Sequence, residues 1–371
     1  MVFLHLSDLH IGKKLGELPL LEDQRHIFDR ILALCARERP DAAVIAGDLY
    51  DRAAPPAEAV ALADDFLTAL ASAVPEVLVA AGNHDSPERL AFGRRFMRGV
   101  SMSPVFSGSF EPVRVADADF WLLPFFKPVQ ARAAYGDESL ETYTQAVRAA
   151  VSHMALEPER ANVLVTHQYV TGADRCDSES VGGGEGVDAS VFDAFDYVAL
   201  GHLHSPQHVL RDTVRYCGSP LKYSLSEASQ EKSATLVERY GRADRVRTVP
   251  LEPLHEVRRL RGRYDDLTLR KNYEGTAVDD YLYITLTDEQ DIPDAAARLA
   301  CVYPNLVFLD YDNRRTRAAL GADEDAPAAQ SASPAELFAS LYRRQNGAEM
   351  TAGQMRYVCA RIDAVWKGEQ A

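Results

Sequence analysis

Residues 42–51 of the 371-residue chain read AAVIAGDLYD, an apolar run followed by a polar turn. Its first five residues are small or branched and apolar, as is typical of a strand that is buried on both faces of a sheet. The polarity changes abruptly at Gly47-Asp48, where the predicted strand ends. Outward from here, residues 2–6 (VFLHL) and 77–81 (VLVAA) repeat the pattern of an apolar strand that ends in a polar turn.

Helical stretches separate these strands. Residues 22–38 place apolar side chains at helical spacing with charges between them, and residues 57–73 form a second amphipathic stretch. Further strands are predicted at 120–123, 163–166 and 197–200. The alternation of strand, polar turn and helix indicates an α/β architecture.

The composition excludes several classes of protein. Apolar residues make up 47% of the chain and charged residues 26%, which is ordinary for a globular protein and excludes collagen, long coiled coils and general disorder. No apolar run approaches the roughly 20 residues of a membrane-spanning helix, and the first residues lack the features of a signal peptide, so we expect no membrane association. The five cysteines are scattered and match no disulfide framework or zinc motif, which favours a reduced, cytoplasmic compartment.

The charge balance bears on possible partners. The chain has 40 basic and 55 acidic residues, a net charge of −15. This alone argues against a nucleic-acid partner, because phosphate binding needs a basic face. A DNA hypothesis therefore needs positive charge that is local, or that metal ions or a partner supply. The one basic cluster is Arg258, Arg259, Arg261 and Arg263, for which contact with a DNA backbone and a solvated face are equally good interpretations.

The character of the sequence changes near Pro250, and a polar, glycine-rich stretch at 171–190 is expected to be a long mobile loop. We predict four parts, in chain order: a domain at 1–250, a small α+β capping domain at 251–317, a linker at 318–333 and a helical segment at 334–371. Ser333 to Glu336 form a capping-box pattern that begins the last part. This helical hairpin is too small to fold alone, so we expect it to dock on another surface.

Five short polar motifs stand where predicted strands end. They are Asp8-Leu9-His10, Gly47-Asp48-Leu49-Tyr50-Asp51, Gly82-Asn83-His84-Asp85, Thr166-His167 and Gly201-His202-Leu203-His204. Because ligands of open α/β sheets bind at the carboxyl ends of strands, we expect these side chains to converge. The D-x-H and H-x-H pairs should each face one side, since side chains alternate along an extended segment. All donors are oxygen or imidazole nitrogen, which suits Mn²⁺, Fe²⁺ or Zn²⁺.

The motifs supply seven donor residues: Asp8, His10, Asp48, Asn83, His167, His202 and His204. If one carboxylate bridges, these donors can hold two ions about 3.5–4 Å apart and leave positions for water and substrate. Each pair alone is commonplace in proteins, whereas five such motifs after five apolar strands are not coincidental. The sequence therefore predicts a two-metal site.

The motifs DxH, GDxxD, GNHD, a later His and GHxH resemble the signature of the calcineurin-like metallophosphoesterase superfamily. The stretches FLHLSDLHIGKKL (3–15), GDLYDRAAPPAEAV (47–60) and YCGSPLKYSLSE (216–227) are more narrowly similar to the SbcD family of nuclease subunits. This resemblance implies a four-layer metallophosphoesterase sandwich, with two mixed sheets flanked by helices, at 1–250. The capping domain and the helical hairpin would follow it.

The resemblance also implies roles for individual residues. One ion would be held by Asp8, His10, Asp48 and His204, and the other by Asp48, Asn83, His167 and His202, with Asp48 as the bridge. His84 would not be a ligand but would act at the leaving oxygen, as a proton donor or as a positive charge. Asp51 or Asp85 would orient His84. The ions, by analogy Mn²⁺, would bring positive charge to the place where a phosphate binds.

By this resemblance the chain is expected to act as a DNA nuclease in repair, recombination and replication. It would be a 3'–5' exonuclease on duplex ends and an endonuclease on hairpins and single strands. Its expected partners are DNA, a second copy of the chain, and an SbcC-type ATPase in a two-plus-two heterotetramer. The segment 334–371 would dock on the coiled coil of that ATPase through its apolar residues: Leu337, Phe338, Leu341, Tyr357, Val358 and Val365. Packing of the segment on its own domain is the alternative.

Two other functions stay open at this point. A phosphoesterase that acts on phosphoproteins or small nucleotides would use the same metal motifs, although the capping domain and the tail argue against a small substrate. A non-catalytic scaffold for a partner is the second alternative, and the intact donor set argues against it.

Overall fold

The computed structural model describes residues 1–174, 186–240, 243–314, 316, 334–346 and 349–366. The chain divides into two compact units, residues 1–285 with 293–310 and residues 286–292 with 311–371. Most of the predicted capping domain thus clusters with the first 250 residues, and the four-part division stays a prediction. Among the described helices, none is long and apolar enough to span a membrane.

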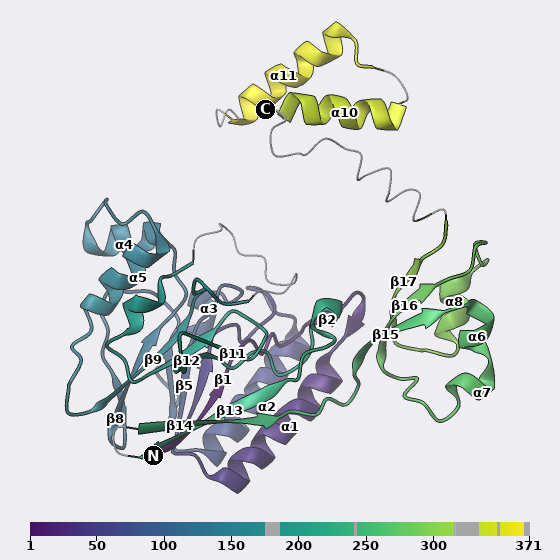
Figure 1. Ribbon diagram of the computed structural model, residues 1–371. Helices are drawn as coiled ribbons and strands as arrows, with labels where there is room; N and C mark the ends of the chain where they lie inside the picture. Colours follow the sequence, from purple (N-terminus) through teal and green to yellow (C-terminus); the bar gives the residue numbers. More distant parts are fainter. Residues whose placement is uncertain (175–185, 241–242, 315, 317–333, 347–348, 367–371) are drawn as a thin grey trace. The chain divides into compact units, whose positions relative to one another are not determined.

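A six-stranded mixed sheet carries the first three polar motifs (Figure 1). Its strand order is β14-β13-β1-β4-β5-β6. The bounds of these strands are β1 (Val2–Leu6), β4 (Ala42–Ala46), β5 (Glu76–Ala80), β6 (Val100–Ser103), β13 (Ser233–Tyr240) and β14 (Ala243–Pro250). β1, β4, β5 and β6 run parallel, whereas β13 runs antiparallel to both β1 and β14.

A second six-stranded mixed sheet carries the remaining motifs, in the order β11-β12-β10-β9-β8-β7. Its strands are β7 (Val113–Val115), β8 (Ala118–Leu123), β9 (Ala161–His167), β10 (Tyr197–Gly201), β11 (Gln207–Val209) and β12 (Arg211–Tyr216). β8, β9, β10 and β12 run parallel, and the two edge strands run antiparallel to their neighbours.

The two sheets pack face to face on an apolar interface. The Phe3 ring meets the rings of Phe120 and Tyr197 edge-on, with centroids 5.3 Å away in each case. Aromatic pairs prefer this T-shaped arrangement over a face-to-face sandwich. The strands at the centre of both sheets are buried on both faces, which explains why they read as continuous apolar runs.

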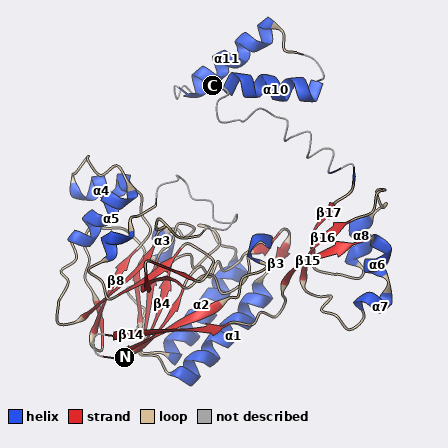
Figure 2. Cartoon of the chain, in the orientation of Figure 1, coloured by secondary structure: helices blue, strands red, loops and turns tan. Residues whose placement is uncertain are grey.

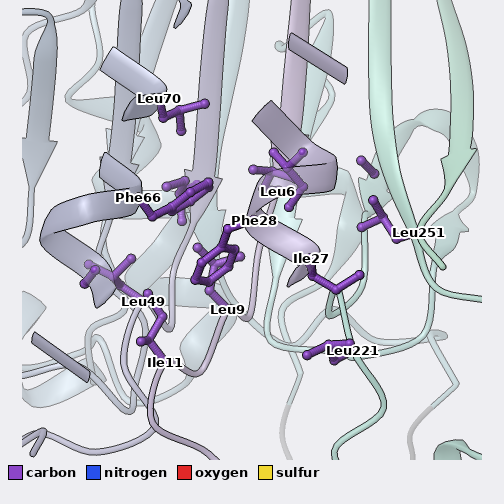
Figure 3. Close-up of a cluster of buried hydrophobic side chains, with 14 of the residues drawn as sticks. Leu6, Leu9, Ile11, Ile27, Phe28, Leu49, Phe66, Leu70, Leu221 and Leu251 are labelled. Carbon is purple, nitrogen blue, oxygen red and sulfur yellow. The ribbon is translucent and has the colours of Figure 1, made fainter. Parts of the chain in front are cut away.

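Helices cover the outer faces of both sheets, and Figure 2 distinguishes them from the strands by colour. The helices of this part are α1 (Leu21–Glu38), α2 (Ala57–Ala73), α3 (Pro87–Leu90), α4 (Pro128–Tyr135) and α5 (Tyr143–Ser152), with the 3₁₀ helices η1 (Ala189–Phe192) and η2 (Leu225–Glu227). The cluster under α1 and α2 includes Leu6, Phe28 and Phe66, and the two phenylalanine rings stack with centroids 4.2 Å apart (Figure 3). A second cluster lies under α4 and α5. The predicted four-layer sandwich is therefore confirmed.

A smaller α+β region follows β14. It contains β15 (Val257–Gly262), β16 (Tyr281–Leu286), β17 (Leu306–Tyr311), α6 (Tyr264–Thr268), α7 (Arg270–Tyr273) and α8 (Ala295–Ala300). Its sheet has the order β15-β16-β17. β15 is the basic stretch that the sequence did not identify as a strand, because arginines occupy its exposed positions and mask the alternation. Arg258 donates to the carboxylate of Asp280 at 2.5 Å, so this member of the basic cluster is ion-paired.

The second unit holds two helices, α10 (Pro334–Asn346) and α11 (Ala352–Trp366), which agree with the predicted hairpin. The predicted cap Ser333 lies outside the described residues. The expected loop at 171–190 is described only at its ends, and its last residues are not a loop. Val187 donates to the carbonyl of Tyr169 at 2.8 Å, and Asp188 caps the 3₁₀ helix η1. The hairpin β2 (Lys14–Leu15) with β3 (Leu18–Pro19) was not predicted.

Candidate metal centre

Five strand ends bring the predicted donors together. β1, β4 and β5 are neighbours in the first sheet, and β9 and β10 are neighbours in the second. The residues that follow or end these strands are Asp8 and His10 after β1, Asp48 after β4, Asn83 after β5, His167 at the end of β9, and His202 and His204 after β10. Because all five strands run parallel within their sheets, the two sheets present their donors at one edge.

The backbone of this edge is mostly left-handed. Asp8, His10, Asp48 and His202 have positive φ angles of 53°, 42°, 50° and 103°. The expectation that D-x-H is extended is therefore wrong, since both ends of the Asp8–His10 motif lie in the left-handed region. Such angles cost a non-glycine residue on the order of 1–3 kcal/mol, and they cluster at functional sites. Main-chain bonds hold the loop in place: the Asp8 N–H donates to Gly47 and the His10 N–H to Asp48, at 3.1 and 3.0 Å.

Three glycines permit the close approach of these loops. A Cβ atom at Gly47 would lie 2.2 Å from Nδ1 of His167, and one at Gly82 would lie 2.1 Å from Oδ1 of Asp48. A Cβ atom at Gly201 would lie 1.8 Å from the carbonyl oxygen of Ala46. No side chain fits at any of these positions. Glycine is therefore required at 47 and 201, where the two sheets meet, and at 82, where the loops after β4 and β5 meet.

The first donor group is formed by Asp8, His10 and His204. One ligand atom of each lies within 4.8 Å of the others, and all three side chains are buried. Asp48 borders this group, because its Oδ2 atom lies 3.7 Å from Nε2 of His10. Asp8 is also held by the main chain, since the N–H of His202 donates to its carboxylate at 3.0 Å.

The second donor group is formed by Asp48, Asn83, His167 and His202. Oδ1 of Asn83 lies 2.9 Å from Nε2 of His167 and 3.0 Å from Nδ1 of His202. Ligands at about 2.1 Å from a shared cation are separated by distances of this order. Oδ2 of Asp48 lies 3.2 Å from the same Nε2 of His167, so this single oxygen faces both donor groups.

Burial and charge set the protonation of the donors. Burial lowers the pKa of His202 to about 3 and that of His10 well below its usual range, so both imidazoles are neutral. Burial also disfavours the charged form of His167, but the adjacent Asp48 carboxylate outweighs it and raises the pKa of His167 to about 9. Neutral imidazole and ionised carboxylate are the forms that bind metal, and a cation at the second group must displace the proton of His167.

Buried polar atoms without partners test whether a metal fits here. Within the described part of the chain, neither ring nitrogen of His10 has a hydrogen-bond partner, although both atoms are buried. Buried polar groups are normally satisfied, so such atoms require an explanation. The donors combine nitrogen and oxygen without sulfur, a set that divalent cations such as Mn²⁺, Fe²⁺ and Zn²⁺ accept. The residues therefore fit divalent metal ions.

The three residues predicted to act beside the metals take different positions. Nδ1 of His84 donates to the main-chain oxygen of Asp51 at 2.9 Å, and the N–H of His84 donates to Asp48 at 2.8 Å. The carboxylate of Asp51 instead meets Nζ of Lys13 at 2.9 Å. The carboxylate of Asp85 accepts three main-chain N–H groups: those of Leu49, Tyr50 and Gly82. The contact that orients His84 thus comes from a carbonyl oxygen, and Asp85 joins the loops after β4 and β5.

Sequence reasoning missed the residues behind His204. Glu227 lies 3.1 Å from Nδ1 of His204, and Lys232 lies 2.6 Å from Glu227. Glu227 ends the family-like stretch 216–227, but nothing in its local sequence marks it as part of the site. Only its contact with His204 in the folded chain identifies Glu227 as part of the site.

The two sheets and their shared donor edge define a calcineurin-like phosphoesterase. A family model with this description, calcineurin-like phosphoesterase, matches residues 1–206, which is more than half of the chain. A second model, described as the type 5 capsule protein repressor C-terminal domain, matches residues 253–346. The chain belongs to the SbcD family within the calcineurin-like phosphoesterases.

Two relatives are named as the D subunit of the nuclease SbcCD. The protein of Staphylococcus saprophyticus is 32% identical over 318 residues, which cover 83% of this chain and 84% of the relative. The protein of Staphylococcus epidermidis is 32% identical over 319 residues, which cover 83% and 85%. The crystal structure of TT1561 of Thermus thermophilus matches 68% of this chain and 99% of its own, with a TM-score of 0.38 and 13% identity.

Replacement of Gly82 by alanine should abolish metal binding while the fold persists. The added Cβ would lie 2.1 Å from Oδ1 of Asp48 and would displace the carboxylate that both donor groups share. We expect bound Mn²⁺, measured by elemental analysis after dialysis, to fall at least tenfold. Gly353→Ala is the matched control, because no atom lies within 4 Å of a Cβ at that position. Full metal content in Gly82→Ala would contradict the shared role of Asp48.

Proposed function

We propose that this chain is the nuclease subunit of an SbcCD-type complex and hydrolyses DNA phosphodiester bonds at a two-ion centre, with Mn²⁺ as the ion. The observation that carries the proposal is the position of Asp48, whose Oδ2 atom faces His10 at 3.7 Å and His167 at 3.2 Å. A bridging carboxylate between two donor groups is what a pair of cations needs. Two relatives at 32% identity are named as nuclease subunits.

The chain's own residues prepare the site for a phosphate. When bound, two divalent ions would neutralise phosphate oxygens and lower the pKa of water at the site. Five of the seven proposed donors are buried, so their positions are set before substrate arrives: Asp8, His10, Asp48, His167 and His204. Main-chain bonds from the loops after β1 and β4 fix Asp8 and His10, which keeps the reorganisation of the protein small.

His84 is suited to act on the leaving oxygen. Its Nδ1 donates a hydrogen bond to a carbonyl oxygen, which can only accept, so Nδ1 keeps its proton. The other ring nitrogen, Nε2, is therefore the one that can exchange a proton with the substrate. One ring nitrogen of His84 lies within 4.8 Å of ligand atoms of His10 and Asp48, which supports a role of His84 beside the ions and not as their ligand. A phosphodiester expels a sugar hydroxyl, and the imidazolium of His84 would protonate that oxygen.

Local positive charge answers the objection that the chain is acidic. Besides the ions, a second arginine-rich segment follows the GNHD motif, although sequence reasoning singled out only the cluster at 258–263. Arg94, Arg95 and Arg98 are exposed in this segment, and Arg89 is exposed on α3. Exposed arginines that follow the GNHD motif in the sequence would supply the phosphate contacts that DNA binding needs. They favour a polyanionic substrate over a small phosphate ester.

An exposed apolar surface favours self-association. Phe92 and Phe96 are 86% and 91% exposed, and Met97 and Val60 are 42% and 45% exposed. Phe92, Met97 and Val60 line a shared groove of about 340 Å³ beside α2. Large exposed apolar side chains that cluster in this way mark protein interfaces. We assign this surface to a second copy of the chain, in a homodimer.

The helical hairpin is assigned to the ATPase partner. Leu337, Phe338 and Leu341 on α10 are 44%, 45% and 49% exposed, and Tyr357 on α11 is 63% exposed. The side chain of Val365 lies outside what the structure describes. An amphipathic helix with exposed apolar residues binds in a groove or on another helix of a partner. A dimer of this chain with one hairpin per copy would hold two ATPase subunits, which would give the expected two-plus-two heterotetramer.

His84→Ala should remove nuclease activity and leave the metal content unchanged. Loss of a proton donor lowers the rate by about 10²–10⁴-fold, and His84 is not among the predicted ligands. Cleavage of linear duplex, hairpin and single-stranded DNA would be measured with Mn²⁺, with and without the ATPase and ATP. His208→Ala is the control, because this histidine is exposed on β11. If the wild type cleaves only nitrophenyl esters or cyclic nucleotides, the small-substrate alternative is supported and the nuclease proposal is contradicted.

Phe96→Ser should convert the dimer to a monomer. The substitution removes an apolar ring that is 91% exposed, and burial of such a ring contributes about 1.5–3 kcal/mol at each of the two copies. The molar mass in solution would be measured by light scattering after size exclusion. Phe308→Ser is the matched control, because Phe308 is 56% exposed on β17. The interface assignment fails if Phe96→Ser stays dimeric or if the wild type is a monomer.

A chain that ends at residue 325 should fold and bind metal but fail to co-purify with the SbcC-type ATPase. The truncation removes both hairpin helices and leaves the donor residues in place. In the full chain, Leu341→Asp should weaken the same interaction, whereas Leu269→Asp, at a comparable exposure of 44% in the smaller region, should not. Co-purification of the truncated chain with the ATPase would show that the hairpin docks elsewhere.

A further inference from the structure

A carboxylate and a lysine lie directly behind His204. Glu227 ends η2 and Lys232 precedes β13, and their side chains are 0% and 3% exposed. Oε1 of Glu227 lies 3.1 Å from Nδ1 of His204, and its Oε2 lies 2.6 Å from Nζ of Lys232. Buried charges persist only when they are paired and hydrogen-bonded, so this pair forms a specific contact with the imidazole of His204.

The same lysine also holds the main chain of His204. Its Nζ donates to the His204 carbonyl oxygen at 2.8 Å and to the Ser219 hydroxyl at 2.8 Å. The N–H of Ser219 donates to that carbonyl at 3.1 Å. A Cβ at Gly218 would lie 2.6 Å from it, so the loop packs tightly here. His204 is therefore held at its ring by Glu227 and at its backbone by Lys232.

The contact with Glu227 decides which nitrogen of His204 can bind a cation. A carboxylate can only accept, so Nδ1 carries the hydrogen and Nε2 is the nitrogen that can act as a ligand in the donor group with Asp8 and His10. His167, in the other group, has a different support, because its Nδ1 donates to the main-chain oxygen of Ala46 at 2.9 Å. One donor group is thus supported by a side-chain carboxylate and the other by the backbone.

We propose that Glu227, held by Lys232, is a positioning residue that fixes His204 as a ligand for one of the two cations only. This inference rests on the proposed two-ion centre and extends it to residues outside the donor motifs. An outer carboxylate that accepts from a ligating histidine orients the ring and raises its basicity, and its loss weakens metal affinity about 10–100-fold. The cation at the Asn83 side should keep its affinity when Glu227 is changed.

The test is a calorimetric titration of the metal-free full chain with Mn²⁺. The wild type should bind two ions, and Glu227→Gln should bind one ion normally and the other about 10–100-fold more weakly. His204→Ala should weaken the same ion, and the double variant His204→Ala/Glu227→Gln should be no weaker than His204→Ala alone. This lack of additivity distinguishes positioning through His204 from a general loss of structure.

Two further variants separate a loss of positioning from a loss of folding. In Glu227→Gln alone, the unpaired charge of Lys232 can impair folding. Glu227→Gln/Lys232→Met removes both buried charges and avoids this effect. Asp244→Asn breaks another buried ion pair, with Arg239 at the opposite end of β13, and should leave both affinities unchanged. Unchanged binding of both ions in the Glu227 variants would overturn the proposal. A wild type that binds no Mn²⁺ would instead overturn the two-ion centre, and this proposal with it.

Discussion

The architecture of the site depends on a main-chain contact between the two sheets. The end of β4 meets the ends of β9 and β10 so closely that a Cβ at Gly201 would lie 1.8 Å from the oxygen of Ala46. Four of the predicted donors follow strands of one sheet, and the other three, all histidines, come from the second sheet, so the donor set exists only while this contact holds. The left-handed angles of the donor loops add strain, which the tightly packed strands behind them sustain.

An acidic protein can bind DNA if its positive charge is concentrated where the phosphates lie. The net charge of −15 is spread over the whole chain, whereas the proposed ions would sit at one edge of the sheets. Exposed arginines follow the GNHD loop at 94–98, close in sequence to His84. At physiological salt, charges that lie more than about 8 Å apart are largely screened from each other. Acidic groups far from a bound phosphate would therefore repel it weakly, and the charges close to it would decide whether it binds.

The proximity of the predicted donor residues could be foreseen from the sequence because each motif is local and follows an apolar strand. Asp8 and His10 do lie close together, as the D-x-H motif predicts, but not because the segment is extended. Both residues have left-handed backbone angles. The orientation of His84 by a carbonyl oxygen had no sequence signal, because every residue has a carbonyl group. β15 was missed because arginines at its exposed positions conceal a strand that is buried only at its start.

The alternation of strands and helices, and the residue types that gather at the strand ends, follow from the order of amino acids alone. Apolar runs need burial on both faces and polar turns cannot enter the core, so this pattern admits few folds. The packing of the two sheets, in contrast, sets which oxygen of Asp48 faces both donor groups and which buried carboxylate supports His204. Glu227 lies 23 positions from His204, and contacts across such a separation depend on how the loops pack and not on any local pattern.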